Sequence, residues 1–108
     1  NRTPDKARAI DDELARLGGH RQVEAAPDHD GGDVDMIVNT TSLGLHEGEA
    51  LPLPLAPVRA DTLIAEIIMV PERTAWLADA EARGLKTHYG RHMLDCQVEL
   101  IGTFIGAL

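Results

Sequence analysis

The hydrophobic pattern of the chain changes its period several times, from helical spacing to short continuous runs and back. In the first twenty positions, apolar residues recur at spacings of three and four, which predicts one amphipathic helix. The residues on its apolar face are Ala7, Ile10, Leu14 and Leu17. Thr3 suits the N-cap position and Pro4 the first helical position, and Gly18 and Gly19 would end the helix. The sequence therefore predicts a helix over residues 1–19.

Short apolar runs predict strands, and the strongest run covers residues 63–69, where every residue except Glu66 is apolar. A run that is apolar on both faces is typical of a strand buried in a parallel sheet. Two further runs, at 34–39 and 86–89, predict two more strands, and residues 22–25 form a fourth candidate.

Two more helices are predicted, at 74–83, where Gly84 ends the segment, and at 91–108, whose wide apolar arc calls for two packing partners. The strand-loop-helix-strand order predicts an α/β fold with a parallel sheet and crossover helices. No Gly-rich phosphate turn occurs in the chain, although an open doubly wound sheet normally carries one after its first strand. We therefore expect a partial Rossmann-type doubly wound parallel sheet that lacks its first strands, in a chain that begins inside a domain.

Composition narrows the range of functions. Aromatic residues are limited to Trp76, Tyr89 and Phe104, too few for a surface on which nucleic acid bases stack. The net charge of −8 also argues against nucleic acid, although one or two cations could still hold a small anionic ligand. The single cysteine, Cys96, excludes an internal disulfide and fits a reducing compartment. No apolar run approaches about 18 residues and no signal peptide is visible, so we expect a cytoplasmic protein without a membrane partner.

The first candidate site lies at the start of the first predicted helix, where Arg2 and Lys6 are the nearest cations. A guanidinium, the Thr3 hydroxyl and the free N–H groups of a helix N-terminus together form a compact phosphate site. In dinucleotide-binding folds an acid after the second strand selects NAD, whereas an Arg accommodates the 2′-phosphate of NADP. No acid precedes Asp5 here, which favours NADP. The alternative is an ordinary solvated helix start.

The second candidate site follows the strand predicted at 34–39. Asn39, Thr40, Thr41 and Ser42 would lie at the carboxyl end of a parallel strand, which is where such folds bind ligands. The alternative is that these small polar side chains bond their own backbone and cap the strand end.

The third candidate site lies at the last predicted helix. Gly90 comes just before it and permits a close backbone approach. Gln97 falls on an apolar stripe of this helix, so its amide is expected to face a buried or half-buried surface and to need a partner. The other residues of the stripe are Met93, Leu100, Phe104 and Leu108. A polyhydroxylated ligand and a backbone carbonyl are the two alternative partners.

Other potential ligands and nucleophiles have simpler interpretations. Residues 28–30, Asp-His-Asp, lie in a polar loop without a converging third ligand and are expected to form a surface turn, not a metal site. His88 and His92 are separated by Gly90 and are not expected to share a helical face. Cys96 has no base beside it and is expected to be a small buried apolar residue.

Taken in order and spacing, four segments resemble the nicotinamide-binding domain of the shikimate/quinate dehydrogenase family. They are Asn1-Arg2-Thr3-x-x-Lys6, the run from Asp35 to Gly44, Ile67-Ile68-Met69-x-Pro71-x-x-Thr74, and Ala82-Arg83-Gly84 followed by Gly90-x-x-Met93-Leu94-x-x-Gln97. The resemblance covers essentially the whole chain. It implies that residues 1–108 are the later portion of an NAD(P)-binding domain, with helix 91–108 packing toward an N-terminal substrate domain.

The resemblance also implies an NADP-dependent oxidoreductase, with NADP preferred to NAD, that serves aromatic amino acid biosynthesis. A hydride would pass between the nicotinamide and a ring carbinol or ketone of a cyclic hydroxy acid. The adenosine 2′-phosphate would be held by Asn1, Arg2, Thr3 and Lys6. The remaining implied cofactor contacts are Asn39, Thr40, Thr41, Ser42, Ile67, Gly90 and Met93. Gln97 would reach the substrate hydroxyls, and Met69 stands where the family usually has a Tyr that contacts the substrate.

In the family, proton transfer is attributed to a Lys and an Asp of the N-terminal substrate domain, so the resemblance implies no catalytic residue in this segment, which alone is expected to be inactive. Arg91 and His92 replace a Leu and a Gly of the family pattern, and Val70 replaces an Asn. Shikimate, quinate and an amino-shikimate therefore all remain candidate substrates. A non-catalytic dinucleotide-binding or regulatory module is the alternative function, and a homodimer is a further candidate assembly.

Overall fold

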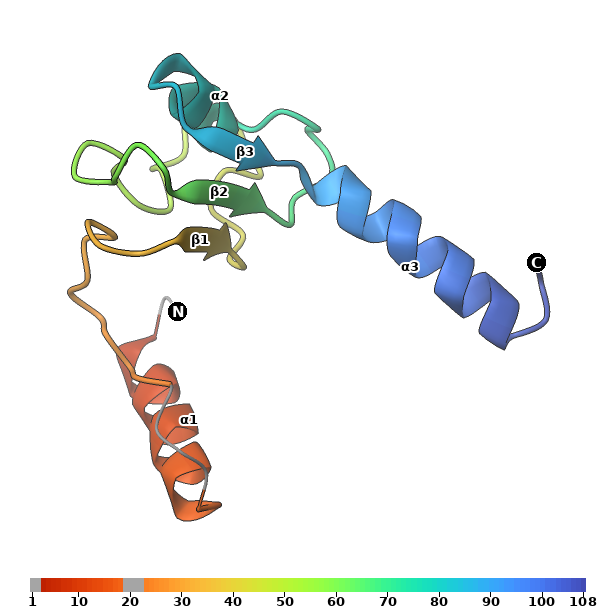
Figure 1. The fold of residues 1–108 in the computed structure, drawn as a ribbon, viewed down its shortest axis with the longest axis horizontal. Coiled ribbons are helices and arrows are strands. Elements are labelled where there is room, and N and C mark those ends of the chain that lie inside the picture. The colour runs from red at the N-terminus through yellow and green to blue at the C-terminus, as the bar shows by residue number, and fades with distance from the viewer. Residues whose placement is uncertain (1–2, 19–22) are drawn as a thin grey trace.

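The computed structural model describes residues 3–18 and 23–108. Three helices and three strands occur in these ranges (Figure 1). In chain order they are α1 (Pro4–Arg16), β1 (Met36–Asn39), β2 (Leu63–Glu66), α2 (Ala75–Ala82), β3 (Lys86–His88) and α3 (Gly90–Phe104). The strands form a parallel sheet in the order β1-β2-β3. This confirms the predicted α/β fold with a parallel sheet.

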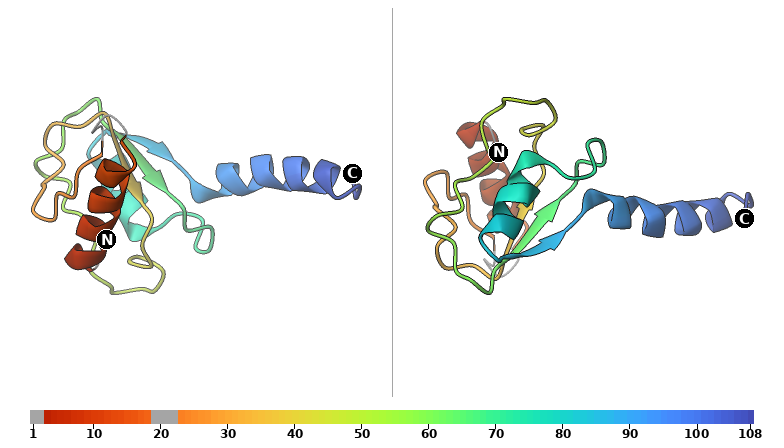
Figure 2. Two further views of the ribbon diagram at one scale, coloured as in Figure 1. Left: turned by 90° about the horizontal axis from the view of Figure 1, so that it is seen from below. Right: turned by 90° about the horizontal axis from the view of Figure 1, so that it is seen from above.

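The hydrophobic core lies between the sheet and α2, which covers one face of it (Figure 2). Its buried residues are Leu55, Ile64, Trp76, Leu77, Ala80 and Leu85. Trp76 is fully buried, and its indole N–H donates a hydrogen bond of 2.9 Å to the carbonyl of Leu53. This one side chain therefore ties α2 to the Pro-rich loop that precedes β2, as expected of a buried Trp whose N–H needs a partner.

The strand β2 is central and buried, as expected, but it ends at Glu66 and not at Met69. One oxygen of the Glu66 carboxylate accepts hydrogen bonds from the backbone N–H groups of Ile67, at 3.0 Å, and Ile68, at 3.2 Å. These two N–H groups are thereby taken out of the sheet ladder, so the chain turns away from the sheet where the apolar run still continues.

The first helix begins at Pro4 with Thr3 at the N-cap position, and Gly18 follows its end with a φ of 75°. The predicted apolar face exists, but it is not packed: Leu17 is 67% exposed, and α1 has no buried residue. The strand predicted at 22–25 is wrong for its described residues 23–25, which form no strand. An isolated apolar run is held as a strand only where a ladder partner lies beside it.

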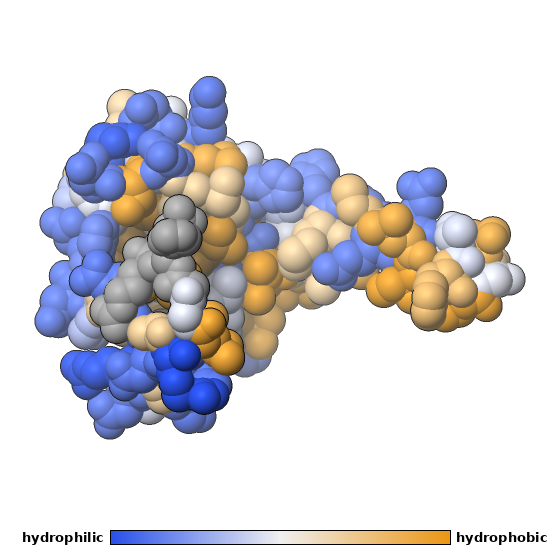
Figure 3. Space-filling view, turned by 60° about the horizontal axis from the view of Figure 1, so that its bottom comes forward, coloured by the Kyte–Doolittle hydropathy of each residue, from blue (hydrophilic) through white to orange (hydrophobic). Residues whose placement is uncertain are grey.

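The last helix projects away from the sheet (Figure 1), and apolar side chains are exposed along the arm that it forms (Figure 3). Phe104 is 91% and Leu100 72% exposed. The prediction that Gln97 faces a buried surface is therefore wrong within this chain, as is the prediction that Cys96 is buried, because both side chains are exposed on α3. Among residues 3–18 and 23–108, no helix is long and apolar enough to cross a bilayer.

Candidate functional site

The carboxyl ends of β1 and β2 meet at one edge of the sheet, which we call the carboxyl edge. Asn39 and Glu66, the last residues of the two strands, are register partners there. The loop 40–44 leaves the carboxyl edge after Asn39, and the segment 67–71 leaves it after Glu66. Because Gly90 begins α3 against residues 67 and 68, the second candidate site and Gly90 of the third come together at this edge.

Two polar side chains are buried at the carboxyl edge. Asn39 is 3% and Glu66 2% exposed. The Asn39 side-chain amide donates to both carboxylate oxygens of Glu66, at 3.0 and 3.1 Å, and to the Leu43 carbonyl at 2.9 Å. A buried carboxylate is tolerable only where hydrogen bonds replace its hydration, and Asn39 supplies part of that replacement.

Glu66 also reaches the start of α2. The Thr74 hydroxyl donates to Glu66 Oε2 at 3.3 Å, and Thr74 Oγ1 in turn accepts from the Leu77 N–H at 3.3 Å as the N-cap of α2. Every buried side-chain nitrogen and oxygen in the described parts of the chain has a hydrogen-bond partner. The polar cluster of Asn39, Glu66 and Thr74 is therefore complete without a ligand.

The loop 40–44 is shaped by the same cluster. The backbone N–H and the hydroxyl of Thr41 donate to Asn39 Oδ1, at 3.0 and 2.7 Å, and the Leu43 N–H donates to Thr41 Oγ1 at 3.1 Å. Asn39 and Thr41 thus cap the strand end, which was one of the two alternatives that the sequence left open. Thr40 and Ser42 are exposed, so their hydroxyls are the ones on this loop that a ligand could reach.

Gly90 is buried where α3 starts, and it confirms the expected close backbone approach. A Cβ atom at this position would lie 2.6 Å from the Ile68 carbonyl oxygen and 2.7 Å from the carbonyl carbon of Ile67. Both contacts are to backbone, which cannot move aside as a side chain can. Only glycine therefore allows the start of α3 to sit against residues 67 and 68, and half-buried Ile67 lies at this junction.

The first candidate site is described only in part. Asn1 and Arg2 lie outside the described residues, and Thr3 and Lys6 are exposed at the start of α1. Gln97 is exposed on α3, and Met93, one turn nearer the sheet, is 40% exposed.

Met69 lines an open groove of about 390 Å³ between the segment after β2 and the first turns of α3. The other lining residues are Val70, Arg91, Leu94, Asp95 and Val98. Within the groove Arg91 Nε lies 3.1 Å from the Asp95 carboxylate, and this hydrogen bond raises the pKa of Arg91. Three of the positions at which the chain departs from the family pattern, Met69, Val70 and Arg91, therefore share one surface.

Other potential metal ligands lie elsewhere in the described parts of the chain. No group of three metal-ligating side chains occurs in the described ranges. His29 lies in a surface turn, as expected, where its Nδ1 accepts from the Gly31 N–H at 2.8 Å. His88 lies on β3 and His92 on α3, so they share no helical face, although their ring centroids are 5.2 Å apart.

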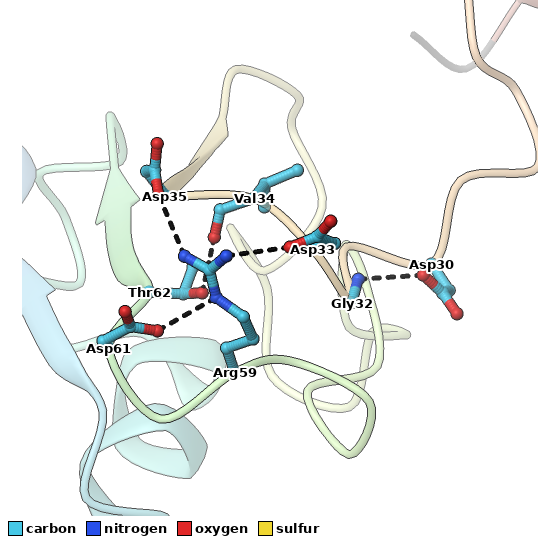
Figure 4. A network of polar contacts seen from close by, with 8 residues as sticks. All are labelled: Asp30, Gly32, Asp33, Val34, Asp35, Arg59, Asp61 and Thr62. Atoms are coloured by element: carbon cyan, nitrogen blue, oxygen red, sulfur yellow. Dashed lines mark hydrogen bonds and ion pairs between the residues drawn. The ribbon is translucent and has the colours of Figure 1, made fainter.

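At the opposite edge, an ion-pair network that the sequence analysis missed joins the starts of β1 and β2 (Figure 4). The Arg59 guanidinium donates to Asp33, Asp35 and Asp61 at 2.8, 2.9 and 3.0 Å, and the carboxylate of Asp35 contributes most to raising its pKa. Two features of the sequence could have revealed this network. Acids alternate before β1, at Asp33 and Asp35, and a cation lies two residues from an acid before β2, at Arg59 and Asp61.

Known proteins similar to this chain cover nearly all of it. The shikimate dehydrogenase (NADP(+)) of Chelativorans sp. is 43% identical over 94 residues, which are 87% of this chain and 33% of that protein. No family model matches. The chain spans about a third of the length of the curated relatives that it matches.

Solved structures give the same result. Shikimate 5-dehydrogenase from Thermus thermophilus, in complex with NADP(H) and shikimate, is 31% identical with a TM-score of 0.71, over 87% of this chain and 33% of that one. The ligand-free 5-ketofructose reductase of Gluconobacter sp. is 29% identical with a TM-score of 0.71, over 87% and 35%. These similarities confirm the resemblance to the shikimate/quinate dehydrogenase family and the Rossmann-type α/β fold.

Proposed function

We propose that this chain is the later portion of the NADP-binding domain of an oxidoreductase that interconverts a cyclic hydroxy acid of the shikimate type and its keto form. The observation that carries the proposal is the 43% identity to an NADP-dependent shikimate dehydrogenase over 87% of the chain. The matched segment folds with small polar residues and a glycine-started helix at the carboxyl edge, where α/β proteins bind ligands.

The residues of the carboxyl edge fit a nicotinamide cofactor by their chemistry. Thr40 and Ser42 offer exposed hydroxyls, half-buried Ile67 offers an apolar surface to a planar ring, and the start of α3 at Gly90 offers backbone N–H groups. The cofactor, when bound, supplies the hydride chemistry, while the protein orients it and excludes water. In this assignment Thr40, Ser42, Ile67 and Gly90 line the nicotinamide side of the cleft, with Met93 nearby.

Asn39 and Thr41 have a different part in the proposal. Both hydrogens of the Asn39 amide and its carbonyl oxygen already have protein partners. These two residues therefore serve the cofactor by holding the loop 40–44 in shape.

At the other end of the cofactor, we assign the 2′-phosphate to Asn1, Arg2, Thr3 and Lys6. An Arg guanidinium and a helix N-terminus are favourable partners for a phosphate dianion, and this pairing accounts for a preference for NADP over NAD.

On the substrate side, we assign Met69 and Gln97. Met69 lines the groove that also contains Arg91, and a guanidinium is a favourable partner for the carboxylate of a small acid. Shikimate, quinate and an amino-shikimate all carry a carboxylate, so the ring substituents that distinguish them are left open.

The exposed apolar face of α3 supports the domain assignment. Apolar residues of α3 that lie mostly in solvent here, such as Leu100 and Phe104, would be covered by a substrate-binding domain that also carries the acid–base residues. Catalysis is therefore assigned to the complete protein. Its proposed partner is the small cyclic acid, and neither a nucleic acid nor a membrane is part of the proposal.

The test is an assay of the complete protein that contains this chain, with NADPH and the keto forms of the three candidate acids. We expect NADPH to be consumed with at least one of them and NADH to be used less well. The rival function is a dinucleotide-binding module without turnover. NADP binding by calorimetry without consumption of NADPH in the presence of any of these acids would establish the rival, and absence of binding would exclude both.

A further inference from the structure

The Glu66 carboxylate is a charged group enclosed by hydrogen-bond donors from three segments of the chain. It is 2% exposed. Its donors are the Asn39 amide, the N–H groups of Ile67 and Ile68, and the Thr74 hydroxyl. We propose that Glu66 is a positioning residue of the carboxyl edge, which fixes Asn39 and, through Asn39, the conformation of the loop 40–44.

A chain of hydrogen bonds connects the loop to the carboxylate, with each donor on the loop side and Glu66 as the final acceptor. Glu66 accepts from Asn39 Nδ2, which orients the Asn39 amide so that its Oδ1 points toward Thr41. Thr41 then accepts the N–H of Leu43, and the Leu43 carbonyl accepts the second hydrogen of Asn39. The loop is therefore closed on an amide whose orientation depends on an acceptor at position 66.

The same carboxylate also fixes the conformation of the segment 67–71, which leaves the carboxyl edge after β2. Its contact with the N–H groups of Ile67 and Ile68 turns the chain out of β2, and that turn presents the backbone against which Gly90 packs. The conformations of the loop 40–44 and of the segment 67–71 thus both depend on the Glu66 side chain. This side chain is buried, so a ligand does not contact it.

Only a carboxylate satisfies this arrangement. All four groups facing Glu66 donate, so a side-chain amide at position 66 would set its own NH₂ against at least one donor. Ion pairs and buried charges are weak devices for stability, because apolar residues of similar volume often serve as well. The presence of a buried acid beside two segments that form the site is therefore better explained by the conformation that it gives those segments than by stability.

The experiment compares Glu66→Gln with Glu72→Gln in the complete protein. Glu72 is an exposed residue six positions further along the chain, so it controls for the loss of one negative charge. Hydrogen exchange is measured over residues 39–45 and, for comparison, over β2 and α2. We expect the Glu66 variant to exchange faster at the amides of Thr41 and Leu43 while the core of α2 keeps its protection, and the Glu72 variant to match the wild type.

The functional readout is NADP affinity and the separation of KM from kcat. The expected effect of Glu66→Gln is a rise of about tenfold in Kd and KM for NADP, the size expected when a hydrogen bond to a charged group is lost, with a smaller change in kcat. Uniformly faster exchange throughout the sheet, with unchanged KM, would show a purely structural role and overturn the proposal. If Glu66→Gln does not fold, Glu66→Asp, which keeps the charge but draws it back, is subjected to the same two measurements.

The inference rests on the proposed function only for its second readout. If the wild-type protein fails to bind NADP, the proposed function fails while the exchange of Thr41 and Leu43 still tests the positioning role. If NADP binds and the loop exchange of the Glu66 variants is unchanged, the positioning role alone is wrong.

Discussion

Asn39 and Glu66 face each other twice: as register partners in the β1–β2 ladder and as hydrogen-bonded side chains 3.0 and 3.1 Å apart. The backbone pairing sets both residues at the same height in the sheet, and the side-chain bond then joins the two segments that leave it. The carboxyl edge is consequently a product of sheet register, since a shift of one residue would point one of the two side chains to the opposite face.

Replacing Asn39 by alanine should destabilise the fold. The change removes one donor from the buried Glu66 carboxylate and the acceptor of Thr41, and an unsatisfied buried polar group costs about 1–3 kcal/mol. Urea unfolding measures the difference. Thr40→Ala, at the exposed neighbouring position, should change stability by less than about 0.5 kcal/mol; equal effects of the two changes would contradict the burial argument.

Gly90→Ala should displace α3 or destabilise the protein by about 1–3 kcal/mol, the usual cost of overpacking. The added methyl would lie 2.6 Å from the Ile68 carbonyl oxygen. Gly102→Ala is the matched control on the same helix, because the new methyl would meet only the flexible side chain of Leu108. Thermal melts of both variants decide the matter, and a Gly90 variant as stable as the Gly102 variant would show that the backbone contact is not tight.

Acid should abolish the stabilisation of the fold that Glu81 provides at neutral pH. The Tyr89 hydroxyl and then Arg73 hold the pKa of Glu81 below its usual value of 4.5. A carboxylate whose pKa is lowered in the folded state stabilises that state at every pH above its usual pKa. This stabilisation is lost as the pH falls through the lowered pKa. Wild type should therefore exceed Glu81→Gln in melting temperature at neutral pH, and the gap should close in acid. A gap that persists after full protonation would contradict this.

The outer turns of α3 should tolerate polar residues in the 108-residue chain, but not where a second domain packs against the helix. Leu100→Ser and Phe104→Ser change side chains that are 72% and 91% exposed, so in the 108-residue chain they should shift stability by less than about 0.5 kcal/mol. In the complete protein the same changes should cost about 2–5 kcal/mol if a second domain buries them. Denaturant unfolding of both forms compares them, and equal small effects would remove the support for domain packing.

Arg2→Ala should weaken NADP binding about tenfold or more, because a hydrogen bond between a guanidinium and a phosphate is of the strong, charge-assisted kind. NAD, which lacks the 2′-phosphate, should bind equally well to the variant and the wild type. Arg16→Ala, at the other end of α1, is the control and should leave both affinities unchanged. Calorimetric titration with each nucleotide gives the comparison. Unchanged NADP binding in the Arg2 variant would remove the phosphate assignment.

Local pattern was enough to predict most elements of the fold. The apolar runs at 34–39, 63–69 and 86–89 contain the three strands, and the helix predicted at 74–83 contains α2 with Thr74 as its cap. Periodicity also predicted α3, since helical spacing is a property of neighbouring residues alone, although the helix ends at Phe104 and not at Leu108.

Long-range contacts explain what the sequence did not reveal. Glu66 stood out as the one polar residue in an apolar strand, but its partner Asn39 lies 27 positions earlier, and Arg59 lies 24 positions from Asp35. The orientation of Gln97 was wrongly predicted because an amphipathic stripe indicates a need for a partner and cannot show whether these 108 residues provide it.

The Arg59 network gives the sheet two ends of different character. At the amino edge, where the strands start, three carboxylates that are 77% to 100% exposed are held by one cation, and dissolved salt weakens ion pairs between such solvent-exposed groups. At the carboxyl edge, the buried contacts of Glu66 are screened far less. Rising ionic strength would therefore loosen the strands at their starts while leaving the proposed cofactor end intact, so that salinity acts on the fold with a direction along the strands.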